Sequence, residues 1–488
     1  MIAAAFWSLI NHAEKTGLIE NGDRDYFVNL LLSRLKLSEP PEQTCDTLSL
    51  CDSLKELSAF AANKGIIEDT FGERDIFETN LMGLLTPRPS EITARFVSLY
   101  KENKESATNW FYKLCCDNNY VRCEDIAKNI EFETPTSFGN LEITINLSKP
   151  EKDPKDIARA AQMPSSHYPK CALCRENEGY EGHINHPPRA NLRLIPIELQ
   201  GEKWGFQYSP YAYFSEHSIA LSQVHRPMAI HKKAFECLLD FIDVFPHYFI
   251  GSNADLPIVG GSILSHEHYQ CGRHTFPMMK APDECKLSFR GFESLECSKV
   301  HWPMSCIRIK GEDRHEITAL ADKILRLWRG YTDEEAFVFA ETNGEKHNTI
   351  TPIAYKEGDS YVFDLVLRNN ITTDTYPLGV YHPHPDKHNV KKENIGLIEV
   401  MGMAILPARL KAEIELMKKA IETNNFDLPE ISHHKAWLEA HSFKNIPSLH
   451  NDILQAIGET FLGVLSDAGV YKDNNAFMKF IEYINKMD

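Results

Sequence analysis

The hydrophobic pattern of the chain changes its period near residue 134, and this change limits the folds that the sequence can adopt. Before that point apolar residues recur every three to four positions, as Phe6, Leu9, Ile10 and Ala13 do, which predicts helices. After it, apolar and polar residues alternate over 141–148, which predicts a half-buried strand. Helices first, then strands and helices in mixed order, are typical of an α+β protein.

Later segments extend this pattern. Strand-like runs are WGFQYSPYAYF (204–214), HSIALSQV (217–224), SCIRIKG (305–311), EAFVFAE (335–341) and SYVFDLVLR (360–368). The spacing of apolar residues predicts a helix over 317–331 and a long helix over 394–423, interrupted at Pro407. Residues 426–488 are predicted to be helical again.

Charge and composition exclude several classes of protein. The 488 residues include 52 Lys and Arg against 69 Asp and Glu, a net charge of −17, and such an acidic surface repels nucleic acid. No run approaches the ~20 apolar residues of a membrane-spanning helix, and no secretory signal is evident. The 12 cysteines are spread through a long chain, which indicates a reduced protein and a cytoplasmic location.

The segment 260–270, GGSILSHEHYQ, carries the most informative motif. It places His266, His268 and Gln270 at i, i+2 and i+4, so on a strand all three side chains point to one face. Two imidazoles and an amide on one face can bind phosphate or a metal, and imidazole can also act as a nucleophile. A chance pair of histidines on a surface strand is the alternative, because the chain has 21 histidines.

A CxxC pair, Cys171 and Cys174, is the second motif. In a cytosolic protein it is a zinc half-site or a redox pair, and its polar, loop-like surroundings favour zinc over thioredoxin-like chemistry. Tetrahedral zinc needs two further ligands. The candidates for these are His183, His186, His217 and His266.

A third motif, HPHPDKHNVKK, places His382, His384 and His388 before Lys391 and Lys392, ahead of a predicted helix. Free N–H groups at the start of a helix attract anions. The segment is therefore a candidate phosphate site, with a solvated polar loop as the alternative.

Together these segments resemble the galactose-1-phosphate uridylyltransferase family, in the longer class found in low-GC Gram-positive bacteria. The similar segments span nearly the whole chain and are FGERDIFETNLMGLLTPRPSEI, FGNLEITINLSKPEKDP, YPKCALCRENEGYEG, FQYSPYAYFSEH, GGSILSHEHYQ, HNTITPIA and HPDKHNVKKENIGLIEVMGMAILPARL. Their number and their common order carry the resemblance.

The resemblance implies an α+β fold with two histidine-triad-like antiparallel-sheet halves. The implied organisation is a helical N-terminal extension (1–135), a first half with CxxC and HxHxQ (136–290), a second half (291–425) and a C-terminal helical segment (426–488).

The resemblance also implies a ping-pong transfer of UMP in galactose metabolism, the Leloir pathway. His268 would attack UDP-glucose and release glucose 1-phosphate, and galactose 1-phosphate would then take the UMP to give UDP-galactose. Gln270 would donate to a phosphoryl oxygen. A neutral amide cannot act as general acid or base for water, which suits transfer rather than hydrolysis.

The remaining implied site residues bind substrate or metal. The substrate-binding candidates are Asn191, Arg193, Asn253, Ser262, Lys391 and Lys392. A structural zinc would be held by Cys171, Cys174, His217 and His266, with no organic cofactor.

The shorter class of the family has a second metal site, for which Glu284 and His347 could match. Asp364 and Val366 stand where two histidines would be expected, so the second site is not expected here.

Two other functions stay open at this point. A dinucleoside-polyphosphate phosphorylase also uses HxHxQ, although the HPDKHN segment and the helical N-terminus argue against it. The other is a non-catalytic scaffold stabilised by zinc. The oligomeric state is open too, with a homodimer as the form of the shorter class.

Overall fold

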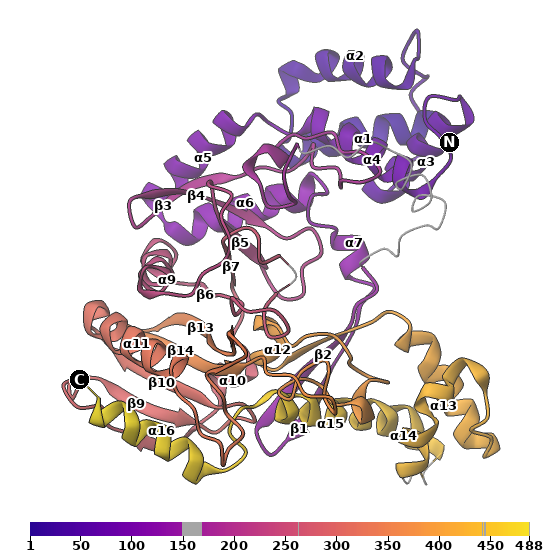
Figure 1. The fold of residues 1–488 in the computed structure, drawn as a ribbon. Helices are drawn as coiled ribbons and strands as arrows, with labels where there is room; N and C mark the ends of the chain where they lie inside the picture. Colours follow the sequence, from indigo (N-terminus) through magenta and orange to yellow (C-terminus); the bar gives the residue numbers. More distant parts are fainter. Residues whose placement is uncertain (149–167, 262, 442, 444–445, 488) are drawn as a thin grey trace. The chain divides into compact units, whose positions relative to one another are not determined.

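The computed structural model describes residues 1–148, 168–261, 263–441, 443 and 446–487 (Figure 1). Contacts between Cα atoms divide the chain into two compact units. The first comprises Met1–Lys128, Ser148–Ala212 and Glu216–His225, and the second comprises Asn129–Leu147, Tyr213–Ser215 and Arg226–Asp488. The domain boundaries drawn from the sequence differ from this division and stay a prediction.

The first unit begins with the predicted block of helices. These are α1 (Ile2–Thr16), α2 (Arg24–Leu35), α3 (Leu50–Asn63), α4 (Phe71–Leu85), α5 (Pro89–Glu102), α6 (Lys104–Asp117) and α7 (Cys123–Ile126). Several of them start where the sequence provides a cap: the side chains of Ser49, Thr70 and Asn103 accept from backbone N–H groups in the first turns of α3, α4 and α6. The same unit contains β3 (Ile195–Leu199), β4 (Glu202–Tyr208) and β5 (Ser218–Ser222), paired antiparallel in that order.

The second unit is built on antiparallel strands. In spatial order they are β7 (His268–Gly272), β6 (Phe249–Gly251), β13 (Asn348–Glu357), β14 (Ser360–Asn369), β10 (Cys306–Gly311), β9 (Glu296–Val300) and β8 (Asp283–Leu287). A separate sheet joins β1 (Ile130–Thr136), β2 (Gly139–Ile145) and β15 (Met403–Leu406), in which β15 runs parallel to β2. The short strands β11 (Glu341–Thr342) and β12 (Glu345–Lys346) form a hairpin.

The helices of this unit follow the predicted order. They are α9 (Lys232–Val244), α10 (Pro277–Lys280), α11 (Arg314–Arg329), α12 (Leu397–Val400), α13 (Leu410–Thr423), α14 (Lys435–Ala440), α15 (Leu449–Ala468) and α16 (Asn474–Lys486). The α+β class with antiparallel sheets is therefore confirmed, with helices at both the N-terminal and C-terminal ends of the chain. No helix in the described parts of the chain is both long and apolar enough to cross a membrane.

The large sheet of the second unit has apolar layers on both faces. On one face lie α9 and α11, where the ring of Phe235 meets that of Phe363 edge-on at 5.3 Å. On the other face Val362 and Val366, which alternate with Phe363, join the main hydrophobic cluster. This two-sided burial matches the nearly continuous apolar run of the strand.

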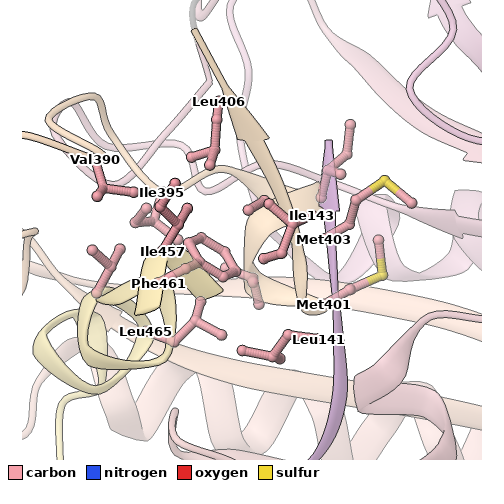
Figure 2. Packing of buried hydrophobic residues seen from close by; sticks show 14 of the residues in the cluster. Leu141, Ile143, Val390, Ile395, Met401, Met403, Leu406, Ile457, Phe461 and Leu465 are labelled. Carbon is pink, nitrogen blue, oxygen red and sulfur yellow. The ribbon is translucent and has the colours of Figure 1, made fainter. Parts of the chain in front are cut away.

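The main cluster packs the sheet of β1, β2 and β15 against α15 (Figure 2). Leu141, Ile143 and Ile145 of β2 are buried as their alternation predicted. Gly458 allows α15 to approach β1 closely, because a Cβ at this position would lie 1.8 Å from Oγ1 of Thr134. A larger residue there would push the helix away from the sheet.

Two predicted elements are wrong. The predicted strand over 335–341 is mostly a turn closed by a bridge between Asp333 and Val338, and Phe337 inside it has a left-handed φ of 57°, which a strand cannot contain. The predicted helix over 394–423 is divided into α12, β15 and α13. Gly402, with a φ of 101°, ends the first helix and turns the chain into β15.

Candidate active site

The HxHxQ motif lies at the start of β7. This strand begins at His268, so His268 and Gln270 lie on one face of it, whereas His266 lies in a bend just before the strand. Tyr269 and Cys271 point to the other face and are buried. β6 fixes the register from one side, with Gly251 opposite Gln270. The expectation of a strand is thus confirmed for two of the three motif side chains.

The imidazole of His268 is held in one tautomer. Its Nδ1 lies 2.8 Å from the backbone carbonyl oxygen of His266, and because a carbonyl only accepts, Nδ1 must carry the hydrogen. Nε2 then has its lone pair free of a proton. Burial lowers the pKa of His268 to about 4, so the ring is neutral at neutral pH. A neutral imidazole with one defined lone pair is a competent nucleophile.

The contacts of Glu267, on the face opposite to His268, hold the start of β7 in place. The carboxylate of Glu267 lies 2.5 Å from Nε of Arg226 and accepts from the hydroxyl of Tyr269 at 3.2 Å. The backbone N–H of Glu267 also donates to the carbonyl of Arg226 at 2.7 Å. Glu267 therefore points away from the face of His268, as alternation along the chain requires. It holds the entry to β7 in place.

The glycines before the motif serve close packing of the chain on itself. A Cβ at Gly261 would lie 2.6 Å from Nδ2 of Asn253, and a Cβ at Gly260 would lie 2.6 Å from the carbonyl oxygen of Ala254. Asn253 is buried, and its Oδ1 accepts from the N–H of Leu397 at the start of α12. The predicted binding residue Asn253 therefore connects the segment before β7 with the segment that follows the predicted lysines.

The two predicted lysines differ in their environment. Lys391 is buried, and its Nζ donates to Oε1 of Glu399 at 3.0 Å and to the carbonyl of Ile405 at 3.1 Å. Lys392 is exposed. The lysine with the free side chain is thus Lys392, whereas Lys391 stabilises the loop.

Two of the other predicted substrate residues, Asn191 and Arg193, belong to the first unit. Asn191 is buried and exchanges amide-to-backbone hydrogen bonds with Asn118. The guanidinium of Arg193 donates to four backbone carbonyls, those of Thr86, Pro87, Ala190 and Leu192. Ser262 lies outside the described residues. A binding role for these three stays a prediction.

A group of metal-type ligands lies in the first unit. Cys171, Cys174 and His225 offer ligand atoms within 4.8 Å of one another. The two Sγ atoms are 3.6 Å apart, and Nδ1 of His225 lies 3.2 Å from Sγ of Cys174. Zn–S bonds of about 2.3 Å in a tetrahedron put two sulfurs about 3.8 Å apart, so the spacing of this donor set fits zinc.

The backbone around the cysteines is already organised for such a site. The N–H of Leu173 points at Sγ of Cys171 at 3.4 Å, and the amide of Asn177 donates to the carbonyls of both cysteines. Asn177 also engages His186, whose Nε2 lies 2.6 Å from its Oδ1. His186, a competing ligand in the sequence, thus supports the loop instead.

His225 stands beside the cysteines where the resemblance suggested His217. His217 is buried just before β5, with its carbonyl accepting from the N–H of Ser209, and it is not among the ligand atoms gathered with the cysteines in the described residues. The sequence contained one signal for His225, its position directly after the strand-like run 217–224. His266 belongs to the second unit.

The residues nearest to a second metal site have other partners in the structure. Asp364 is fully buried in β14 and forms a two-point ion pair with Arg308 on β10, with contacts of 2.8 and 2.9 Å. His347 bonds Thr342 and Asn370, and Glu284 pairs with Lys299. The Asp364 carboxylate holds the pKa of Arg308 above its usual range.

Asp364→Asn is expected to destabilise the protein by about 3 kcal/mol, because it leaves the Arg308 charge buried without its partner. Urea unfolding followed by fluorescence measures this loss. The matched control is Glu284→Gln, which breaks the Glu284–Lys299 pair near the surface and is expected to cost at most about 1 kcal/mol. Equal effects of the two substitutions would contradict a structural role for the buried pair.

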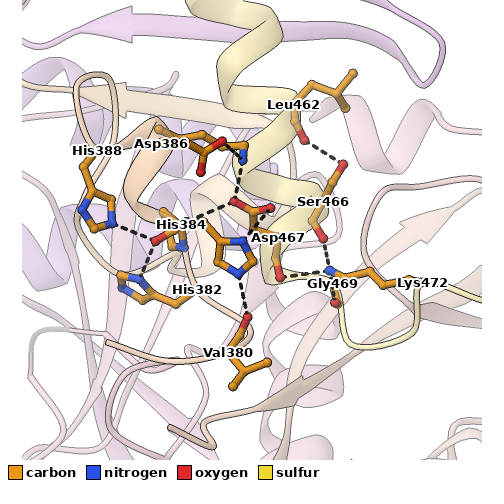
Figure 3. A network of polar contacts seen from close by, with 12 residues as sticks. Val380, His382, His384, Asp386, His388, Leu462, Ser466, Asp467, Gly469 and Lys472 are labelled. Carbon is orange, nitrogen blue, oxygen red and sulfur yellow. Dashed lines mark hydrogen bonds and ion pairs between the residues drawn. The ribbon is translucent and has the colours of Figure 1, made fainter. Parts of the chain in front are cut away.

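The HPHPDKH motif forms a polar network in the second unit (Figure 3). Nζ of Lys387 contacts Asp386 at 2.8 Å and Asp467 at 3.1 Å, and Asp467 also accepts from the N–H of His384. Although His384, Asp386 and Asp467 have metal-type donors close together, the ammonium of Lys387 already lies between the two carboxylates and pairs with both. The motif builds the loop rather than a cation site.

Sequence reasoning also missed Arg368, which is fully buried on β14. Its Nη2 donates to the carbonyl of Ile395 at 2.8 Å and its Nη1 to Oγ1 of Thr351 at 3.2 Å. Burial lowers the pKa of Arg368 to about 10. Arg368 therefore fixes the chain between Lys391 and α12. No spacing rule in the sequence marks it.

Comparison with known proteins points to the same family as the sequence motifs. Residues 32–227 match the N-terminal domain model of galactose-1-phosphate uridyl transferase, and residues 241–438 match the C-terminal domain model. The chain is 48% identical to the galactose-1-phosphate uridylyltransferase of Clostridium acetobutylicum, covering 98% of each chain. It is 49% identical to that of Ligilactobacillus salivarius, over 96% of this chain and 95% of the relative. The chain therefore belongs to the galactose-1-phosphate uridylyltransferase family and is a nucleotidyltransferase.

Proposed function

We propose that this enzyme transfers UMP between UDP-glucose and galactose 1-phosphate through a uridylyl group held on Nε2 of His268. The observation that carries the proposal is the 2.8 Å contact between Nδ1 of His268 and the carbonyl of His266. This contact supports a proton on Nδ1 and an unprotonated Nε2, the atom that attacks phosphorus in the proposal. The lowered pKa of the buried ring keeps that atom unprotonated.

The reaction proceeds in two displacements. In the first, Nε2 of His268 attacks the α-phosphorus of UDP-glucose, a P–N bond forms, and the P–O bond to the β-phosphate breaks. Glucose 1-phosphate leaves with the electron pair of that bond. In the second, a phosphate oxygen of galactose 1-phosphate attacks the same phosphorus, the P–N bond breaks, and UDP-galactose leaves with His268 neutral again.

Other residues of the chain position the reacting groups in this proposal. The amide of Gln270, on the same face of β7 as His268, donates to a non-bridging oxygen of the α-phosphate and stabilises charge there. Lys392 meets the phosphate of the hexose 1-phosphate, while Lys391 and Asn253 fix the loop that carries it. Asn191, Arg193 and Ser262 are kept as proposed substrate contacts on the basis of the resemblance.

We further propose that zinc is bound by Cys171, Cys174 and His225, with His266 as the fourth ligand that the resemblance assigns. The fit of the donor spacing to tetrahedral geometry supports the first three. Zinc bound here would cross-link the chain and stabilise its fold. None of the 12 cysteines, all of which lie in the described residues, forms a disulfide, in keeping with the proposed cytoplasmic location. A homodimer is proposed from the shorter class of the family.

The test of the proposed function needs only one substrate. Incubating the enzyme with UDP-glucose alone is expected to release glucose 1-phosphate up to one equivalent per active site and then stop, because the uridylyl group stays on the protein. The release is measured with a coupled phosphoglucomutase assay. Release that requires galactose 1-phosphate would contradict the covalent route and indicate a ternary complex.

A further inference from the structure

A cavity of about 780 Å³ lies in the second unit, away from the predicted site residues. Its walls come from the turn 333–337, the segment 373–381 and the start of α16. None of the predicted nucleophile, substrate or metal residues lines it. Its volume falls within the range of small-molecule sites, about 300–1,000 Å³.

Aromatic rings form part of these walls. Phe337 is 41% exposed and sits at a left-handed φ of 57°, a conformation that a bulky residue rarely adopts. The hydroxyl of Tyr381 donates to the carbonyls of Ala336 and Phe337 and holds this turn. Tyr376 stacks on His384 of the HPHPDKH motif at 4.3 Å between ring centroids. The apolar rings at the cavity are thus fixed from behind rather than loose.

One wall also contains an unsatisfied polar group. Tyr471 lines the cavity and is only 8% exposed, and its hydroxyl has no hydrogen-bond partner among the described residues. Buried hydroxyls are nearly always paired, because an unpaired one costs free energy. A ligand hydroxyl, reached by a small shift of the ring, would supply the missing partner.

The charged side chains of the cavity lining disfavour an anionic ligand, because carboxylates outnumber lysines among them. Lys479 is paired with Glu335 at 2.5 Å and lies 3.8 Å from Asp333. Nζ of Lys472 donates to the backbone carbonyls that end α15 (Figure 3). Asp473 accepts from the N–H of Asn475 and caps α16. Both lysines are therefore bound within the protein, the three lining carboxylates outnumber them, and the negative charge left over would repel a phosphorylated ligand.

We propose that this cavity binds an uncharged, hydroxyl-rich ligand, a free hexose. Carboxylates, threonine hydroxyls and the Asn475 amide supply acceptors and donors for several ligand hydroxyls, while the apolar face of a sugar ring packs on Phe337 and Tyr376. Because Asp333 and Glu335 already pair with Lys479 and Asp473 caps α16, an organic cation would gain little free energy from pairing with these carboxylates. The site is distinct from the transfer site, whose substrates all carry phosphate.

The HPHPDKH network supports one wall of this site. His384 packs behind Tyr376, and Asp467 joins His384 to Lys387 while its backbone carbonyl accepts from Lys472 (Figure 3). His384 of the motif therefore supports the hexose site, whereas Lys392 after it serves the transfer site in the proposed function. The motif and the lysines that follow it therefore have different proposed roles, although they are contiguous in the sequence.

The test is a titration of the full-length enzyme with D-galactose and D-glucose, followed by ligand-observed NMR. We expect saturable binding with a millimolar Kd that persists when galactose 1-phosphate saturates the transfer site. Phe337→Gly removes the ring and relieves the left-handed strain, so it is expected to fold normally and to weaken hexose binding at least 10-fold. Tyr376→Ala, which removes the half-buried ring on the cavity wall, gives a second measure.

Two control variants show whether the hexose binds at this cavity and independently of the transfer site. Phe71→Ala removes an exposed aromatic ring elsewhere (51% exposed) and is expected to leave the Kd unchanged, as is His268→Asn, so the result does not depend on the transfer mechanism. The proposal is overturned by the absence of saturable hexose binding, by displacement with galactose 1-phosphate, or by binding of tetramethylammonium in place of hexose. A dimer lost on Phe337→Gly would instead assign the cavity to a subunit interface.

Discussion

His268→Asn is expected to lower kcat for UMP transfer by at least ~10⁴-fold, a loss of the size seen when a covalent nucleophile is removed. The asparagine amide retains a donor for the carbonyl of His266, the partner of Nδ1 in the native ring. It lacks the unprotonated ring nitrogen that attacks phosphorus. Steady-state kinetics with circular dichroism and a thermal melt measure the loss of chemistry and the retention of the fold.

His268→Gly gives the matched rescue. Removing the ring leaves space on the face of β7, and uridine 5′-phosphoimidazolide brings an imidazole that is already bonded to the phosphorus. The variant is expected to convert this donor and galactose 1-phosphate to UDP-galactose, while it stays inactive with UDP-glucose. A folded Gly variant that uses neither donor would argue that His268 supports structure, as the scaffold alternative requires.

Zinc loss is the second large expected effect. Cys174→Ser and His225→Asn are each expected to reduce zinc from one equivalent toward zero, with a zinc affinity at least ~100-fold weaker, since even partners of a metal ligand cost 10- to 100-fold. The melting temperature falls with it, because binding free energy is also folding free energy. Elemental analysis of the purified proteins and thermal melts with and without added zinc check both statements.

The controls address which histidine binds. Cys45→Ser changes an exposed cysteine and is expected to alter neither zinc content nor stability. His217→Asn is expected to keep its zinc, since His217 is not gathered with the cysteines. Zinc lost from His217→Asn and kept by His225→Asn would contradict the arrangement of Cys171, Cys174 and His225.

The local hydrophobic pattern of the sequence predicted most helices and strands whose own residues carry a strong periodic signal. Alternation in β2 and the helical spacing of α11 are strong periodic signals, and both elements are present. The apolar run before Pro407 was predicted as helix and forms β15 instead, because periodicity alone does not tell a short buried strand from a buried helical segment. Pairing with β2, far earlier in the chain, decided for β15, and no local rule contains that information.

The site was predictable to a similar degree. The period-two spacing placed His268 and Gln270 on one face, and the CxxC pair marked two ligands of the proposed zinc site. The position of His225 after the run 217–224 did not single it out, because no spacing rule fixes the length of chain between the cysteines and a later histidine. Arg368 and Asn253 act through backbone groups of distant segments, and such long-range partners leave no mark in the spacing of residues.

The most direct test of the covalent route is to map the intermediate. The enzyme is incubated with UDP-glucose labelled in the uridine, quenched and kept under basic conditions, digested, and analysed by tandem mass spectrometry. We expect one UMP per active site, stable to base and labile to acid, on Nε2 of His268 in the peptide that contains HEHYQ. A label on another residue, or no label under conditions in which UDP-galactose forms, would contradict the role of His268.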